Sequence, residues 1–105
     1  EEEEEEQSLK QQYGWLYDRL INIFFIHDPV GLAALGAPDD EYSPEVNKFL
    51  PHLQETQSPQ TLSELLYNVF VLMFNEEMIL SRRSRFDTIA KDVWDEYQIW
   101  KSEQI

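Results

Sequence analysis

The sequence has 105 residues, of which 21 are acidic and eight are basic, so its formal net charge at pH 7 is −13. This charge argues against nucleic acids and membranes, whose phosphates are also negative, and favours a partner protein with a basic surface. A hydrophobic fraction of 42% excludes a disordered chain, and the lack of cysteine excludes disulfides and thiolate metal sites.

The chain divides into an acidic start and one longer segment of mixed composition. Residues 1–7 form an acidic low-complexity tail, in which the first six residues are glutamates. Such runs usually stay solvated, although a helical extension or a non-native addition would have the same composition. Residues 8–105 are predicted to form a single helical domain. No stretch resembles a signal peptide or a transmembrane helix, so we expect a cytoplasmic protein.

The first predicted helix runs from about Ser8 to Ile26. Apolar residues recur along it every three or four positions, which is the spacing of one helix face: Leu9, Tyr13, Leu16, Leu20, Ile23 and Phe24. Three more apolar residues, Trp15, Ile21 and Phe25, lie beside this face or away from it. We therefore expect the helix to bury more surface than one neighbour covers.

A turn-rich segment, residues 27–43, follows this helix and holds two of the three glycines. We expect Asp28 to cap a short helix that starts at Pro29 and ends at Gly36. His27 would stabilise the end of the preceding helix as a cation. The residues predicted to shape the turn are Asp28, Pro29, Gly31, Gly36, Pro38 and Tyr42.

The second predicted helix starts with Ser43 as its cap and Pro44 at its first position. Its inward-facing residues are Val46, Phe49, Leu50 and Leu53. Pro51 lies among them and donates no backbone hydrogen bond, so we predict a kink or a break there.

Ser58 and Pro59 repeat the arrangement of a cap followed by proline, and they predict a third helix that ends near Asn75. Its main apolar face consists of Leu62, Leu65, Leu66, Val69, Phe70 and Met73. A second apolar face consists of Tyr67, Val71 and Phe74. Because this is the most apolar helix of the chain, we expect it to be central or to offer a second contact surface.

Ser81 or Ser84 is expected to cap the last helix, with Asp87 completing a capping box that starts at Ser84. The apolar face of this helix consists of Phe86, Ile89, Ala90, Val93, Trp94, Tyr97 and Trp100. No segment alternates polar and apolar residues as a strand would. The predicted fold is therefore all-α, an antiparallel four-helix bundle-like domain with an additional short helix in the first interhelical loop.

The run Asp28-Pro29-Val30-Gly31, followed by Glu41-Tyr42 and then Glu45-Val46, resembles the uncharacterised YugE-like family of small helical bacterial proteins. Proteins of that family are similar in order, with a first helix, a D-P-x-G turn, an E-Y-x-x-E helix start and two further amphipathic helices. The likeness extends over residues 16–100, and the insert 32–40 departs from it. The resemblance implies an all-helical bacterial protein, and because the family has no agreed function, it adds no catalytic residue.

Acidic side chains of the turn are the candidates for a hard-cation site, as a metal-dependent hydrolase would need. They are Asp28, Asp39, Asp40 and Glu41. The spacing of an EF-hand is absent, and a solvated turn whose acids cap the next helix accounts for them better. A zinc site at His27 or His52 would need carboxylates to complete it. We predict neither a metal site nor a cofactor.

The basic residues Arg82, Arg83 and Arg85 form the only basic cluster of the sequence, at the expected start of the last helix. Positive charges at that end oppose the helix dipole, so something should offset them. Nearby acidic side chains are one explanation, and an anionic ligand or partner is the other.

These observations favour a small acidic helical protein-binding module without catalytic activity. We expect it to be a homodimer, through surplus apolar surface on the first and third predicted helices. The predicted interaction surface consists of Trp15, Ile21, Phe25, Tyr67, Val71 and Phe74. One alternative is an immunity-type inhibitor of a basic toxin or nuclease. The other is the metal-dependent hydrolase.

Overall fold

The computed structural model describes residues 2–80 and 82–104, with side chains from residue 4 onward. Among the described residues, all regular secondary structure is helical and there is no strand. Its elements are α1 (Glu2–Tyr13), α2 (Trp15–His27), α3 (Ser43–Phe49), the 3-10 helix η1 (Leu50–Glu55), α4 (Pro59–Met73), α5 (Glu76–Leu80) and α6 (Arg83–Ser102). The predicted all-α class is confirmed.

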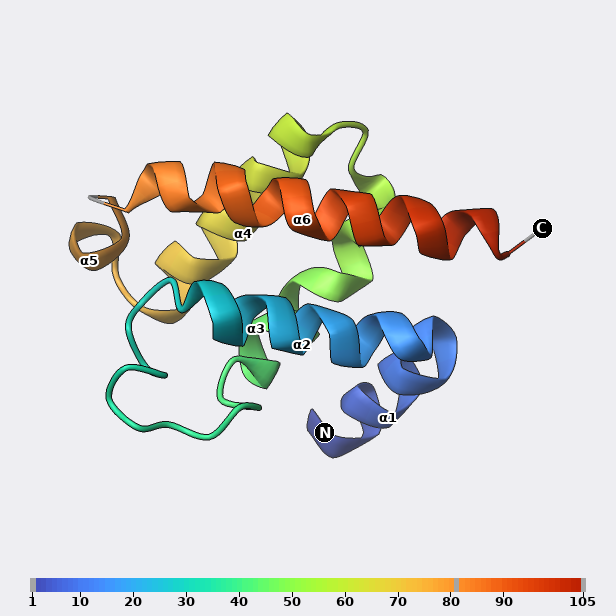
Figure 1. Cartoon of the computed structure of the whole chain (residues 1–105), viewed down its shortest axis with the longest axis horizontal. Coiled ribbons are helices and arrows are strands. Elements are labelled where there is room, and N and C mark those ends of the chain that lie inside the picture. Colours follow the sequence, from blue (N-terminus) through green and yellow to red (C-terminus); the bar gives the residue numbers. More distant parts are fainter. Residues whose placement is uncertain (1, 81, 105) are drawn as a thin grey trace.

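Helices α2 and α6 lie side by side and run in opposite directions (Figure 1). Helix α6 also packs on α4, α4 packs on α3, and α3 packs on α2, so these four helices close a ring of contacts. Helix α5 lies at one end of the molecule, and the C-terminus of α6 lies at the other (Figure 1).

Aromatic side chains from separate elements fill the core between these helices. Phe70 of α4 stacks on Phe24 of α2 with ring centroids 5.6 Å apart. It also lies 5.1 Å from the ring of Phe86 on α6 and 6.2 Å from that of Tyr42. Most residues of the predicted helix faces are buried here, which confirms the helical periodicity. In the described residues, we find no helix with both the length and the apolar character needed to cross a membrane.

The single helix predicted from Ser8 to Ile26 is wrong, because the chain breaks at Gly14 into α1 and α2. Gly14 has φ 57° and ψ −127°, a combination that glycine adopts far more readily than other residues. Its amide donates to the carbonyl of Lys10, and its carbonyl accepts from the amide of Tyr17. Gly14 therefore closes α1 and opens α2. Helix α1 includes Glu2–Gln7, so the helical alternative describes that part of the acidic run.

The short helix predicted from Pro29 to Gly36 is also wrong, since this stretch is a series of turns. Asp28 ends α2 in the left-handed conformation, with φ 49° and ψ 59°. Its carboxylate accepts hydrogen bonds from the amides of Ala33 and Ala34, rather than from the first turn of a helix. The prediction that Asp28 caps a helix is therefore wrong, because its carboxylate holds a loop instead.

Boundaries on the second and third predicted helices agree closely with the structure. The predicted break at Pro51 is confirmed, because α3 ends at Phe49 and continues as η1. Tyr42 is the N-cap of α3, one residue before the predicted cap. Ser58 caps α4 as predicted, accepting a hydrogen bond from the amide of Thr61.

The predicted cap of the last helix is wrong at Ser84. This residue lies inside the first turn of α6, whose N-cap is Arg82, while Ser81 lies outside the described residues. Asp87 makes no capping box with Ser84. Its carboxylate instead accepts from the Ser63 hydroxyl at 2.6 Å, which ties α6 to α4. The short helix α5 was not anticipated.

Candidate functional site

The turn-rich segment is held by Asp28 and Tyr42, whose side chains meet beneath it. The Tyr42 hydroxyl donates to Asp28 Oδ1 at 2.6 Å, and it accepts from the amides of Val30 at 3.2 Å and Leu32 at 3.4 Å. Tyr42 itself is fully buried. These contacts explain why the segment keeps a defined course without regular secondary structure.

The electrostatics of this pair follow from the same contacts. Desolvation acts to raise the pKa of Asp28, but hydrogen bonds from Tyr42, Ala33 and Ala34 outweigh it and lower that pKa, helped by the charge of Arg85. Burial, together with the hydrogen bond to Asp28, raises the pKa of Tyr42. The Asp28 carboxylate therefore acts as a hydrogen-bond acceptor for groups of the turn.

Two of the three arginines of the predicted anion patch bind other groups of the protein. Arg82 donates to the carbonyl of Pro29 at 3.1 Å, which ties the start of α6 to the turn. Arg83 donates to the Ser63 hydroxyl at 2.8 Å, and its guanidinium lies 4.9 Å from the ring centroid of Tyr67. Arg85 is exposed. Arg83 also pairs with Asp87 at 3.3 Å, which supports the explanation that a nearby acidic side chain offsets part of this charge.

The predicted interaction surface lies mostly against the protein's own core. The side chains that pack there are Ile21, Tyr67, Val71 and Phe74, and Phe74 stacks on Phe70 at 5.7 Å. Phe25 is half-buried. Trp15 is exposed, and its indole N–H donates to Glu103 at 2.8 Å, joining the start of α2 to the end of α6.

Neither proposed metal site has converging ligands. Within the described part of the chain, no three histidine or carboxylate side chains are placed to hold an ion together. Of the four acidic residues of the turn, Asp28 is bound to Tyr42, and the other three are exposed. His27 pairs with Asp92 across α2 and α6 at 2.6 Å.

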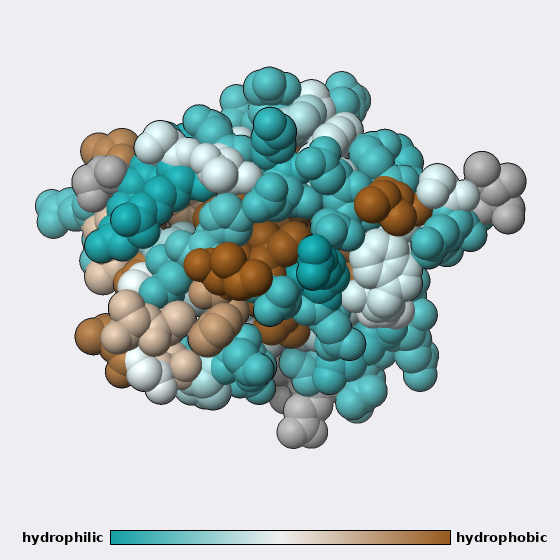
Figure 2. Space-filling model, viewed as in Figure 1, coloured by the Kyte–Doolittle hydropathy of each residue, from teal (hydrophilic) through white to brown (hydrophobic). Residues whose placement is uncertain are grey.

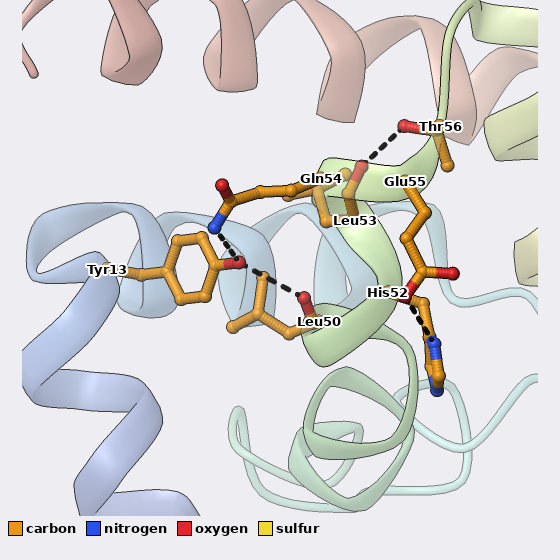
Figure 3. A network of polar contacts seen from close by, with 7 residues as sticks. All are labelled: Tyr13, Leu50, His52, Leu53, Gln54, Glu55 and Thr56. Atoms are coloured by element: carbon orange, nitrogen blue, oxygen red, sulfur yellow. Dashed lines mark hydrogen bonds and ion pairs between the residues drawn. The ribbon is translucent and has the colours of Figure 1, made fainter.

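The second histidine belongs to a polar network around η1 (Figure 3). His52 Nδ1 lies 3.2 Å from Glu55 Oε2 at the surface. On the other side of η1, the Tyr13 hydroxyl donates to the carbonyl of Leu50 and accepts from the side-chain amide of Gln54. The bonds of Tyr13 fix α1 to η1. The pair of His52 and Glu55 is separate from them and lies on the other side of η1 (Figure 3).

The structure does contain an acidic hollow that sequence reasoning missed. It has a volume of about 390 Å³ and lies between α1, α2 and the turn. Its walls carry the carboxylates of Glu6, Asp18, Asp39 and Asp40, and Lys10 is the only cation among the described lining residues. The Tyr17 hydroxyl donates to Glu6 Oε1 at 3.1 Å. Burial and the hydrogen bond to Glu6 raise the pKa of Tyr17.

A second hollow of about 380 Å³ adjoins the first, since both are lined by Glu6 and Ser43. It lies between α1, α3 and the end of α4, and we call it the α1–α3 groove. Its lining residues are Glu5, Glu6, Ser43, Pro44, Asn47, Lys48, Leu72 and Met73. Leu72 is 70% exposed and Met73 is 37% exposed, so the groove offers apolar surface beside carboxylates.

The face on which α2 and α6 lie side by side is mainly hydrophilic (Figure 2). Hydrophobic residues come to that surface between α2 and α6 and over the turn-rich segment (Figure 2). A shallow hollow on this face is lined by Arg19, Ile26, His27 and neighbouring acids of α6. Arg19 and Glu96 pair across it at 3.1 Å.

Glu45 is close in sequence to residues that line these hollows. It is unusual for a carboxyl group because it is only 4% exposed. Burial raises its pKa to about 7, and the nearby charge of Glu41 acts in the same direction. Glu45 belongs to the first turn of α3, one residue after Pro44 of the α1–α3 groove.

Sequence reasoning missed the hollows because their walls come from distant parts of the chain. Glu6 was assigned to a solvated tail, and Asp39 and Asp40 were assigned to a solvated turn. The sequence does show many acidic residues in the tail and in the turn. It does not show that the chain bends at Gly14, which brings α1 close to the turn.

Comparisons place the chain beside no known protein. No protein-family model matches it, and neither curated proteins nor solved structures give a match. The resemblance to the YugE-like family and the bacterial origin that it implies accordingly stay predictions, as does the absence of catalysis that we expect from the residues.

Proposed function

We propose that the protein is a non-catalytic binding module for a partner protein that presents a basic surface. The observation that carries this proposal is the acidic hollow, where side chains of α1, α2 and the turn bring four carboxylates and one lysine together. An acidic surface attracts a basic partner, speeds its association and rejects acidic competitors. A cytoplasmic, immunity-type inhibitor of a basic toxin or nuclease is one form that such a module would take.

A bundle-like scaffold is part of this proposal. The closed ring of contacts through α2, α6, α4 and α3 supports it, as does the antiparallel course of α2 and α6. Such a scaffold holds α1 and the turn in place around the acidic hollow. A preorganised surface of this kind loses little conformational entropy when it binds.

The test starts with recovery of the protein from its own cells, followed by purification of the protein that accompanies it. The two are then titrated against each other, and the affinity should fall steeply as the salt concentration rises. Asp39 and Asp40 are exposed, so the double variant Asp39→Asn, Asp40→Asn should fold normally and lose at least about tenfold in affinity.

The matched control is the double variant Glu76→Gln, Glu77→Gln. It changes the net charge by the same amount at exposed positions on α5, away from the hollow. Its affinity should stay close to that of the unaltered protein. If both double variants lose the same affinity, only overall charge matters, and the hollow is not the binding site.

Self-association is a second candidate, favoured by the exposed apolar residues Met78 and Leu80 on α5. A homodimer should have twice the chain mass in sedimentation equilibrium. Met78→Lys should return it to the monomer mass without unfolding. If the interface instead uses the apolar surface predicted from the sequence, Phe25→Lys on α2 should do so. A monomer mass for the unaltered protein at high concentration would eliminate this candidate.

A further inference from the structure

We propose that the α1–α3 groove receives a basic amphipathic segment of the partner, with apolar anchors on Leu72 and Met73 and cationic side chains toward Glu5 and Glu6. The inference rests on the proposed function, because it takes the partner to be basic. It adds the place and the kind of chain segment that binds there. Helix-in-groove recognition of this sort uses a few apolar anchors spaced by three or four residues.

The exposed apolar residues of the groove lie next to each other. Single exposed apolar residues are common on protein surfaces and carry no meaning. Leu72 and Met73 are instead consecutive residues at the end of α4, both exposed, and both line the same hollow beside Pro44 of α3. Methionine adapts its shape to an incoming side chain more readily than branched residues do.

Charge selects the occupant. The groove is lined by the carboxylates of Glu5 and Glu6 and by the ammonium of Lys48. The adjoining acidic hollow adds three more carboxylates and Lys10, whose ammonium pairs with Glu6 at 3.7 Å, so acidic groups still outnumber basic ones. A second copy of this chain, with its net charge of −13, would bring further negative charge to the same place. A segment with apolar and cationic sides complements both features of the groove.

Two synthetic peptides of about 18 residues test the inference, titrated calorimetrically into the full chain. Both contain the same numbers of leucine, lysine and alanine. In the first, the leucines repeat with helical spacing and form one face, and in the second they are distributed around the helix. We expect the amphipathic peptide to bind at least about tenfold more tightly.

Leu72→Gln should remove this preference. The residue is exposed, so the variant should fold, and its affinity for the amphipathic peptide should fall about tenfold while its affinity for an oligolysine of equal charge stays unchanged. The matched control is Ile99→Gln, which removes a 51% exposed apolar residue from α6. That control should bind the amphipathic peptide normally.

The outcomes separate the inference from the proposed function. If oligolysine and both peptides bind equally well, the chain prefers basic partners, but the groove inference is overturned. If no cationic probe binds, both proposals are overturned. If the unaltered protein sediments as a dimer and Leu72→Gln returns it to a monomer, a second copy covers the groove, and the amphipathic segment is ruled out.

Discussion

Tyr42 shows how a single residue can replace regular secondary structure in a loop. Its hydroxyl is buried, donates to Asp28 and accepts from two loop amides. Removing it leaves these groups without a partner away from water, which is more costly than the net gain from an ordinary hydrogen bond.

Tyr42→Phe should therefore lower the free energy of unfolding by about 1–3 kcal/mol, as measured by urea denaturation. The pKa of Asp28 should rise in the variant, because the hydrogen bond from Tyr42 lowers it in the native protein. Tyr97→Phe is the control, because Tyr97 is 3% exposed and its hydroxyl has no hydrogen-bond partner within the described part of the chain but is not among the buried polar atoms. An equal loss from both variants would contradict the proposed role of Tyr42.

The pKa of Asp28 also has a consequence for acid stability. Because this pKa is lower in the folded chain than in the unfolded chain, the unfolded chain takes up a proton first as the pH falls. The contribution of Asp28 is complete above the unfolded pKa of about 3.9, and it is lost as the pH falls through the folded pKa.

Glu45 acts in the opposite direction. Its pKa is about 7 in the folded protein against an ordinary value of 4.5, so the folded chain holds the proton over this interval. The contribution of Glu45 to stability is greatest below pH 4.5 and is lost as the pH rises to about 7. Above that value, the folded state keeps an ionised carboxyl that is almost fully buried.

Glu45→Gln removes this ionisation while keeping the shape of the side chain. At about pH 8 the variant should be more stable than the unaltered protein by up to about 3 kcal/mol, and the difference should shrink toward pH 5. Denaturation at several pH values measures it, with the exposed Glu64→Gln as the control. A difference that does not change with pH would show that Glu45 does not titrate in this interval.

At the scale of the elements, the junction between α1 and α2 depends on one residue. An alanine side chain at Gly14 would meet no atom within 4 Å, so the only obstacle to substitution is the backbone conformation. The positive φ with ψ −127° is unfavourable for any residue that has a Cβ atom.

Gly14→Ala should thus destabilise the protein by about 1–3 kcal/mol, despite the higher helix propensity of alanine. Circular dichroism during thermal unfolding measures the change. Gln12→Ala, at an exposed position of α1, should change stability by less than about 0.5 kcal/mol. A more stable Gly14→Ala variant would mean that α1 and α2 form one continuous helix.

The same junction explains what sequence reasoning missed about the elements. Leu9, Tyr13 and Leu16 keep helical spacing across Gly14, and a glycine inside a helix costs only about 1 kcal/mol. Periodicity therefore could not reveal the break. By contrast, Pro51 and Ser58 act through local chemistry, and both predictions about them are confirmed.

At the scale of the whole molecule, Phe70 connects the helices. Its ring contacts those of Phe24 on α2, Tyr42 at the end of the turn-rich segment, Phe74 at the end of α4 and Phe86 on α6. Phe70→Ala should lower the free energy of unfolding by about 3–5 kcal/mol, through lost burial and the cavity left behind. Chemical denaturation measures it. The exposed apolar Leu72→Ala is the control, and an equally small effect from both would place Phe70 outside the core.

The sequence alone determined the all-α class, most of the buried helix faces, the break at Pro51 and the cap at Ser58. These properties depend on spacing within one turn of helix and on bonds between residues close in the chain. The tertiary structure alone decided where α1 lies, that Arg82 meets the Pro29 carbonyl and Arg83 the Ser63 hydroxyl, and which acids surround the hollows. Such contacts join residues far apart in sequence, and only the packing of the helices against one another brings them together.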